Sequence, residues 1–155
     1  EVALRYDRKI IIEQGVVGRE IEMALLVNDY PKTSVFGEIK PLTEFYDYDS
    51  KYKDNTTELI IPAQVTDEVL VKMQEMAKCA FKILDLSGLV RADFFVTEQN
   101  EVIINEVNTM PGFTPVSMYP MLWQKSGLSY PELINQLIQL ALERFNEKQK
   151  LQYNK

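Results

Sequence analysis

The segments LVRADFFVT (residues 89–97) and VIINEV (residues 102–107) constrain the fold of this chain more than any other feature of its sequence. Both are rich in β-branched and aromatic residues, and only the four residues 98–101 separate them. Two such segments at this spacing predict an antiparallel β-hairpin. If residues 98–101 form the turn, Thr97 pairs with Val102, and the register of the other pairs follows.

This register gathers polar side chains on one face of the hairpin. It predicts three cross-strand pairs, which are Asp93 with Glu106, Arg91 with Asn108 and Phe95 with Ile104. Directly opposed carboxylates repel each other, so the pattern favours a cation between them. Arg91 supplies part of that charge, and a hard metal ion such as Mg²⁺ would supply more. The pattern also leaves open a solvated polar face, a glycosidase-like carboxylate pair and passive Ca²⁺ binding.

Further strands are predicted from shorter apolar or alternating runs. They lie at residues 9–13, 19–28 and 37–40. The first two are expected to form a hairpin, joined by a turn that contains Gly15 and Gly18. Residues 41–57 are polar and aromatic without a clear period, which predicts a long functional loop.

Two segments have the three-to-four residue spacing of apolar side chains that is typical of amphipathic helices. The first covers residues 67–85 and has Thr66 as its expected N-cap. The second runs from about residue 130 to residue 147 and starts with a capping box of Ser129 and Glu132. The apolar face expected for this second helix is Leu133, Ile134, Leu137, Ile138, Ala141 and Phe145.

The sequence contains no histidine, which narrows the chemistry that the chain can perform. Catalytic triads and dyads that contain histidine are excluded, and a zinc site is disfavoured. Any catalysis must therefore use carboxylates, Arg, Lys, Tyr and Ser. The net charge of −6 argues against nucleic acid or an anionic membrane as a partner. A single cysteine, Cys79, predicts no disulfide framework and indicates a reducing compartment.

Four segments resemble the C-terminal part of D-alanine–D-alanine ligases, a family of the ATP-grasp superfamily. RADFFVTEQNEVIINEVNTMPGFTPVSMYP, residues 91–120, is similar to the C-terminal signature of that family. IIIEQGVVGREIEMALL, residues 10–26, resembles its hinge segment, and FYDYDSKY, residues 45–52, resembles its mobile active-site loop. GLSYPELINQLIQLALER, residues 127–144, resembles its final helix. The resemblance therefore covers nearly the whole chain.

The resemblance implies roles for residues of the hairpin and of the loop that follows it. Asp93, Glu106 and Asn108 match the ligands of two Mg²⁺ (or Mn²⁺) ions that hold the phosphates of ATP. Arg91 and the backbone N–H of Gly112 match the groups that stabilise a tetrahedral oxyanion. These positions would therefore form the catalytic centre.

Further positions match substrate and nucleotide contacts of the same family. Ser117, by its hydroxyl, and Met118, by its backbone N–H, would hold the carboxylate of the second D-alanine. Glu20 would bind the ribose and Lys51 a phosphate, while Tyr52 matches the catalytic-loop tyrosine of D-alanine-selective members. The hinge residues that would read adenine are Glu13, Gln14, Gly15 and Val16.

The fold implied by the resemblance is α+β, the C-terminal half of an ATP-grasp fold, with a mixed or antiparallel sheet and flanking helices. Residues 1–155 would all belong to this half, with 41–57 as the mobile active-site loop and 146–155 as a frayed tail. The family's N-terminal domain and the first half of its ATP-grasp domain have no counterpart here. The sequence does not begin with Met, and we expect it to be a fragment that is inactive by itself.

The implied activity is ATP-dependent joining of two D-alanines through an acyl phosphate, in the cytoplasm, for peptidoglycan precursors. ATP and D-alanine are the expected partners, with no nucleic acid and no membrane. The resemblance leaves open that the full-length protein forms a homodimer. The alternatives are a D-alanine–D-lactate or D-alanine–D-serine ligase and a catalytically silent nucleotide-binding fragment. Tyr52 within FYDYDSKY favours D-alanine as the second substrate, because depsipeptide-forming relatives depart from this loop pattern.

Overall fold

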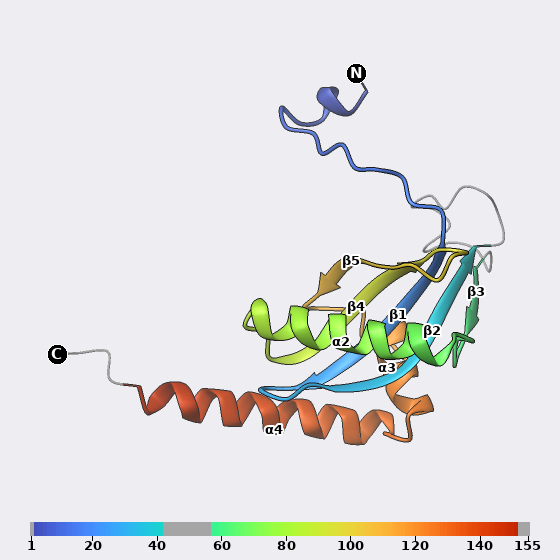
Figure 1. Ribbon diagram of the computed structural model, residues 1–155. Helices are drawn as coiled ribbons and strands as arrows, with labels where there is room; N and C mark the ends of the chain where they lie inside the picture. The colour runs from blue at the N-terminus through green and yellow to red at the C-terminus, as the bar shows by residue number, and fades with distance from the viewer. Residues whose placement is uncertain (1, 42–56, 152–155) are drawn as a thin grey trace.

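The computed structural model describes residues 2–41 and 57–151. Within them, five strands form one antiparallel sheet in the order β3-β2-β1-β4-β5 (Figure 1). The strands are β1 (Arg19–Val27), β2 (Lys32–Pro41), β3 (Thr57–Ile60), β4 (Gly88–Val96) and β5 (Val102–Asn108). Together with the helices, this sheet confirms the predicted α+β class.

Helices cover both faces of the sheet, and each face has its own core (Figure 1). Helix α2 (Asp67–Ile83) packs on one face, where Met73 and Phe81 are fully buried. Helices α3 (Met118–Lys125) and α4 (Tyr130–Gln149) cover part of the opposite face, where Tyr119 is buried and donates a hydrogen bond to the carbonyl of Leu25 at 2.9 Å. The half of this second face that the helices leave uncovered holds the polar residues of the hairpin.

The ends of helix α2 follow from local sequence. Thr66 is the N-cap, as predicted, and its hydroxyl accepts a hydrogen bond from the backbone N–H of Val69 at 3.3 Å. At the other end Asp85 adopts a φ of 50°, and the N–H of Leu86 bonds back to the carbonyl of Phe81 at 3.0 Å. This reversal directs the chain from α2 into β4.

Helix α4 begins at the predicted capping box, but it buries a narrower stripe than its pattern predicts. Leu133 is fully buried, and Leu137 packs on the same core. Three other large residues of the expected apolar face are exposed, Ile134 by 39%, Ile138 by 53% and Phe145 by 59%. Because only part of this long helix lies against the sheet, the remaining apolar positions face outward. Among the described helices, α4 included, none is long and apolar enough to cross a membrane.

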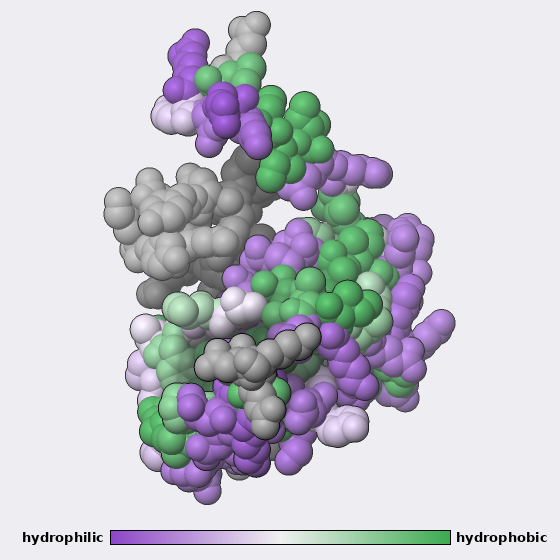
Figure 2. Space-filling view, turned by 90° about the vertical axis from the view of Figure 1, so that its left-hand side faces the viewer, coloured by the Kyte–Doolittle hydropathy of each residue, from purple (hydrophilic) through white to green (hydrophobic). Residues whose placement is uncertain are grey.

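The predicted strand at residues 9–13 is absent, so the hairpin predicted between residues 9–13 and 19–28 was also wrong. Residues 6–18 contain no strand, and Ile11 and Ile12 are 86% and 88% exposed. Figure 1 shows this segment leading away from the sheet, and Figure 2 shows hydrophobic side chains along it at the top of the view. A strand needs a partner for its backbone hydrogen bonds, and no described strand pairs with these residues.

The strand predicted at residues 37–40 is confirmed, but it is only the end of β2, which begins at Lys32. Its neighbour β3 was not predicted, because four residues are too few for a periodic signal. Residues 42–56 lie outside the described part of the chain, so the long loop expected there stays a prediction.

Gly37 permits helix α3 to approach β2 closely. A Cβ atom at this position would lie 2.6 Å from Sδ of Met118 and 3.0 Å from Cδ2 of Leu122. Gly37 also pairs with Glu22 of β1, which lies in the uncovered half of the sheet. The close approach of α3 at Gly37 therefore places the helix at the border of this half. A larger side chain here would push on the helix that follows the hairpin loop.

We therefore expect Gly37→Val to destabilise the chain by roughly 1–3 kcal/mol, the usual cost of overpacking a core. Urea unfolding followed by circular dichroism measures this change. Gly15→Val is the matched control, because a Cβ there has no atom within 4 Å. Equal stability of the two variants would show that α3 does not need the missing side chain.

Candidate active site

The β4–β5 hairpin has the predicted pairing at its polar end. Asp93 pairs with Glu106 and Arg91 with Asn108. Two other predicted pairs were wrong, because Val96 rather than Thr97 pairs with Val102, and Phe95 pairs with Ile103 rather than Ile104. The register thus changes once along the hairpin, between the Asp93 and Phe94 positions.

Two irregularities of the hairpin, a longer connection and a bulge in β5, have opposite effects on the register. The connection between Val96 and Val102 holds one residue more than predicted, and it is closed by a hydrogen bond from the Thr97 N–H to the Glu101 carbonyl at 3.0 Å. Strand β5 also has an extra residue, Asn105, between the positions that pair with Phe94 and Asp93. A β-bulge of this kind re-aims the side chains on either side of it. As a result, Ile103 and Glu106 both lie on the face that carries Asp93.

A hydrogen-bonded cluster occupies the centre of this face. Nε of Arg91 donates to Oδ1 of Asp93 at 2.7 Å, and the terminal NH2 of Arg91 donates to Oδ2 at 2.7 Å. Nδ2 of Asn108 donates to Oδ2 of Asp93 at 3.1 Å and to Oε1 of Glu106 at 2.8 Å. Asp93 is buried, whereas Glu106 is exposed. The structure therefore brings together four of the predicted site residues.

Glu22 belongs to the same cluster, although the sequence analysis did not identify it. It pairs with Asp93 across β1 and β4, its side chain is buried, and its Oε2 lies 3.1 Å from Nε of Arg91. The sequence holds a signal for it, because Glu20 and Glu22 alternate with apolar residues in the run from Glu20 to Val27. That signal needed the pairing of β1 with β4, and these strands are far apart in sequence.

Burial and the neighbouring charges shift the pKa values of Arg91 and Asp93. Burial disfavours the charged form of Arg91, but the hydrogen bond with Asp93 and the nearby Glu22 and Glu106 carboxylates outweigh it and raise the pKa of Arg91. For Asp93, burial raises the pKa, Arg91 opposes this, and the charge of Glu106 adds to the rise. Three carboxylates share one guanidinium, so the cluster has an excess of negative charge that favours a bound cation.

The donor set of this cluster fits a hard divalent cation. Asp93, Glu106 and Asn108 carry carboxylate and amide oxygens on adjacent strand positions. In the described part of the chain, no group of three or more His, Cys, Asp or Glu side chains converges as a complete metal cage. Mg²⁺ is commonly held by one or two carboxylates, with phosphates and water filling its remaining positions. The arrangement thus fits a metal that binds together with a phosphorylated ligand.

A groove of about 500 Å³ lies beside the cluster. The four predicted hinge residues line one part of it, and residues of the hairpin at and near the bulge line the other. The described lining residues are Glu13, Gln14, Gly15, Val16, Phe95, Ile103, Ile104 and Asn105. Glu20 pairs with Phe95 across β1 and β4, which places it between the groove and Glu22. The structure therefore brings the hinge segment next to the hairpin, with Glu20 at their junction.

The loop after β5 leads into helix α3. Ser117 is the N-cap residue of α3, but its Oγ accepts the N–H of Thr114 at 3.0 Å instead of a helix N–H. Gly112 is exposed, and a Cβ there would lie 3.1 Å from Oγ of Ser117. Met118 is the first helical residue, and its side chain is buried in the core beneath. N–H groups in the first turn of a helix are free to bind an anion.

Lys51 and Tyr52, which were predicted to act from the long loop, lie outside the described residues. Their roles stay predictions.

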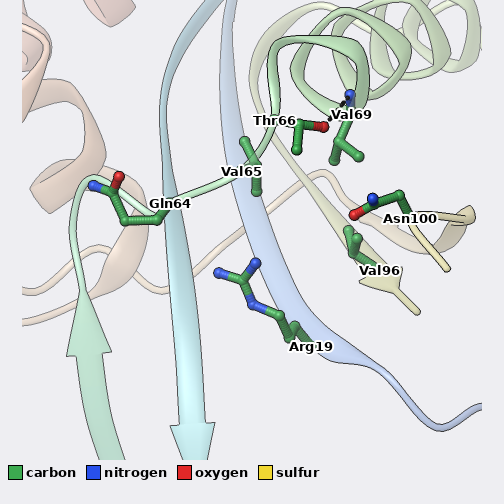
Figure 3. Close-up of a pocket in the computed structure, with 7 residues that line it drawn as sticks. All are labelled: Arg19, Gln64, Val65, Thr66, Val69, Val96 and Asn100. Carbon is green, nitrogen blue, oxygen red and sulfur yellow. Dashed lines mark hydrogen bonds between the residues drawn. The ribbon is translucent and has the colours of Figure 1, made fainter. Parts of the chain in front are cut away.

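A smaller pocket of about 240 Å³ lies on the α2 side of the sheet (Figure 3). Figure 3 shows Thr66 and Val69 of the α2 N-terminus on one side of it and Arg19 on another. Among the described residues that line it, Arg19 alone is charged, and its guanidinium makes two hydrogen bonds to Glu38, at 2.9 and 2.6 Å. Since Thr66 caps its own helix, this pocket offers little to a charged ligand.

Two curated D-alanine–D-alanine ligases have sequences similar to this chain. The ligase of Geobacillus kaustophilus is 62% identical over 151 residues, which are 97% of this chain and 41% of that protein. The ligase of Bacillus pumilus is 60% identical over 149 residues, which are 96% of this chain and 41% of that protein. The chain thus spans about two fifths of the length of these curated relatives.

Solved structures give the same picture. The Coxiella burnetii D-alanine-D-alanine ligase matches with a TM-score of 0.81 and 42% identity over 95% of this chain and 38% of that one. The VanG D-Ala:D-Ser ligase of Enterococcus faecalis matches with a TM-score of 0.71 and 35% identity over 82% of this chain and 37% of that one. A Bacillus anthracis D-alanine–D-alanine ligase complexed with ATP matches with a TM-score of 0.73 and 26% identity over 88% of this chain and 43% of that one.

The family itself is shown by a sequence profile that covers most of the chain. The profile is described as the D-ala D-ala ligase C-terminus, and it matches residues 1–139. These residues contain the hinge segment, all five strands, the polar cluster and the loop before α3. The chain therefore belongs to the D-ala D-ala ligase C-terminus family.

Proposed function

We propose that this chain forms one side of the active site of a D-alanine–D-alanine ligase, which joins two D-alanines with ATP through an acyl phosphate. The observation that carries this proposal is the guanidinium of Arg91. It is fixed by Asp93 and lies beside Glu22, in line with the groove at the hinge segment. The product would serve peptidoglycan precursor synthesis.

The order of side chains along the uncovered half of the sheet supports an extended nucleotide. The row with Phe95 and Glu20 borders the groove, and the row with Asp93 and Glu106 follows two residues further along. Two strand residues span about 7 Å. Base, ribose and phosphates would then follow one another along the sheet, with adenine at residues 13–16 and the ribose at Glu20.

Beyond the proposed phosphate positions lie the groups for the reacting carbonyl. Arg91 and the backbone N–H of Gly112 would donate hydrogen bonds to the oxyanion that forms when the second amine attacks the acyl phosphate. Donors that are fixed in advance stabilise developing charge most strongly, and Arg91 is held by carboxylates on two strands. Ser117 and the first N–H groups of α3 would hold the carboxylate of the attacking D-alanine.

Asp93, Glu106 and Asn108 would hold two Mg²⁺ or Mn²⁺ ions. When bound, these ions would neutralise the phosphate oxygens and stabilise the charge that develops during phosphoryl transfer. Asn108 already bridges the two carboxylates, so it would keep their oxygens on the same side of the hairpin. Acyl phosphates hydrolyse in water, and we propose residues 41–57, with Lys51 and Tyr52, as the loop that excludes it.

Specificity for the second substrate is the finer part of the proposal. The curated relatives at about 60% identity are D-alanine–D-alanine ligases. This high identity supports D-alanine as the second substrate. The substrates also suit the cytoplasm, where ATP is available and where a free, exposed thiol such as that of Cys79 stays reduced.

The full-length protein with this C-terminal sequence should release ADP and form a dipeptide from D-alanine. With competing second substrates, we expect D-alanine to exceed D-serine and D-lactate in kcat/KM by at least about tenfold, the scale on which one pocket contact discriminates. Mass spectrometry of the products measures this ratio. A preference for D-serine or D-lactate would replace the proposed specificity, and ATP binding without any product would favour a silent nucleotide-binding protein.

A further inference from the structure

Arg91 has two carboxylate partners on its Nε side. Oδ1 of Asp93 lies 2.7 Å from Nε, and Oε2 of Glu22 lies 3.1 Å from the same atom. Asp93 belongs to β4 and Glu22 to β1, and both residues are 2% exposed. One guanidinium edge is thus within reach of acceptors on two different strands.

In the proposed active site, Asp93 both accepts hydrogen bonds and ligates a cation. Its Oδ1 accepts a hydrogen bond from Arg91, and its Oδ2 accepts hydrogen bonds from both Arg91 and Asn108. A carboxylate offers about four lone-pair directions, and three of them accept these hydrogen bonds, so a cation that takes more than one position on Asp93 displaces part of this bonding. A half-buried guanidinium that lost its acceptor would be costly, because uncompensated charge in a protein interior is strongly disfavoured.

The layout of the strands separates the two sets of partners. Glu106 and Asn108 lie on β5 and Glu22 lies on β1, on opposite sides of β4. Neighbouring strands are about 4.8 Å apart, so Glu22 and Glu106 are roughly 9–10 Å apart at their backbones. Asp93 can therefore turn toward the β5 side while Arg91 stays on the β1 side.

On this basis, and resting on the proposed function, we propose that Glu22 is a positioning residue for Arg91. It accepts the Nε–H of Arg91 when Asp93 binds a cation, so that the guanidinium keeps its place for the oxyanion. Glu22 acts through Arg91 and does not itself ligate the metal. Its position on the central strand β1 favours this role, because neighbouring strands hold it on both sides.

The proposal makes a specific statement about metal affinity, which can be measured without turnover. If Glu22 is removed, Arg91 keeps hold of Asp93 and competes with the cation. In the full-length protein with a non-hydrolysable ATP analogue, Glu22→Ala should weaken Mn²⁺ binding about tenfold, the usual scale for residues that support metal ligands. Electron paramagnetic resonance of free Mn²⁺ measures the dissociation constant.

The decisive comparison is a double-mutant cycle with Arg91→Met. Without Arg91 no guanidinium competes with the cation for Asp93, so adding Glu22→Ala to Arg91→Met should change the Mn²⁺ dissociation constant by less than about twofold. If Glu22 instead ligates or simply attracts the cation, its removal weakens binding equally in both backgrounds, and the proposal is overturned. Unchanged Mn²⁺ binding in the single variant Glu22→Ala also overturns it.

Two further variants keep the test interpretable. Glu38→Gln removes a carboxylate that pairs with Arg19 on the same sheet, at the α2 side, and it should leave Mn²⁺ binding unchanged. If Glu22→Ala does not fold, Glu22→Gln keeps the volume and an acceptor oxygen and takes its place in the cycle, with a smaller expected loss. Failure of the unaltered protein to bind Mn²⁺ would overturn the proposed function, whereas binding without the predicted coupling would overturn only the role of Glu22.

Discussion

Replacing Glu106 by glutamine in the full-length protein should lower Mg²⁺-dependent ATP turnover about a thousandfold or more. Glu106 lies opposite Asp93 and is bridged to it by Asn108. A metal ligand at this position stabilises charge in the transition state by several kcal/mol, and about 4 kcal/mol corresponds to a thousandfold in rate. Steady-state release of ADP at saturating ATP measures the loss.

The fold should survive this change. Glu106 is exposed, and the amide oxygen of glutamine can still accept the hydrogen bond from Asn108. Glu101→Gln is a matched control, since it neutralises an exposed carboxylate in the connection of the same hairpin, away from the cluster. Turnover near the normal rate in Glu106→Gln, with an unchanged melting temperature, would remove Glu106 from the proposed metal site.

The pairing at the polar end of the hairpin was predicted correctly because two errors in the assumed register cancel there. The assumed four-residue turn was one residue too short, and the bulge at Asn105 added one residue to β5. The two errors cancel for Asp93 with Glu106 and for Arg91 with Asn108. They do not cancel on the other side of the bulge, where Ile104 faces the α2 core instead of the site.

Strand pairs that are far apart in sequence leave no signal in the periodicity of either strand. Periodicity predicted β1 and α2 with nearly correct bounds, because each has a clear apolar pattern. It could not show that β1 pairs with β4, so Glu22 was not recognised as part of the cluster. The run KIIIE failed for a related reason, because an apolar run becomes a strand only where a partner strand exists, and no described strand pairs with it.

The final prediction concerns the 155-residue chain by itself, which we expect not to join D-alanine at a measurable rate. Its described residues place the proposed metal ligands, Arg91 and the second-substrate loop on one face of a single sheet. Beside them residues 10–15 are exposed, with Ile11 and Ile12 at 86% and 88%. The curated relatives are more than twice as long as the matched region, which leaves room for groups on the other side of the nucleotide.

Catalysis by positioned charges requires the triphosphate to be held from more than one side. A misplacement of about 1 Å can cost about a hundredfold in rate, so losing contacts on one side of the nucleotide should cost far more, at least about 10⁴-fold. The assay incubates the chain with ATP, Mg²⁺ and D-alanine and measures dipeptide and phosphate, with the full-length protein as the positive control. If the chain forms dipeptide at more than about 10⁻⁴ of the rate of the full-length protein, the chain already contains a complete site. The proposal that it forms only one side of the site would then be wrong.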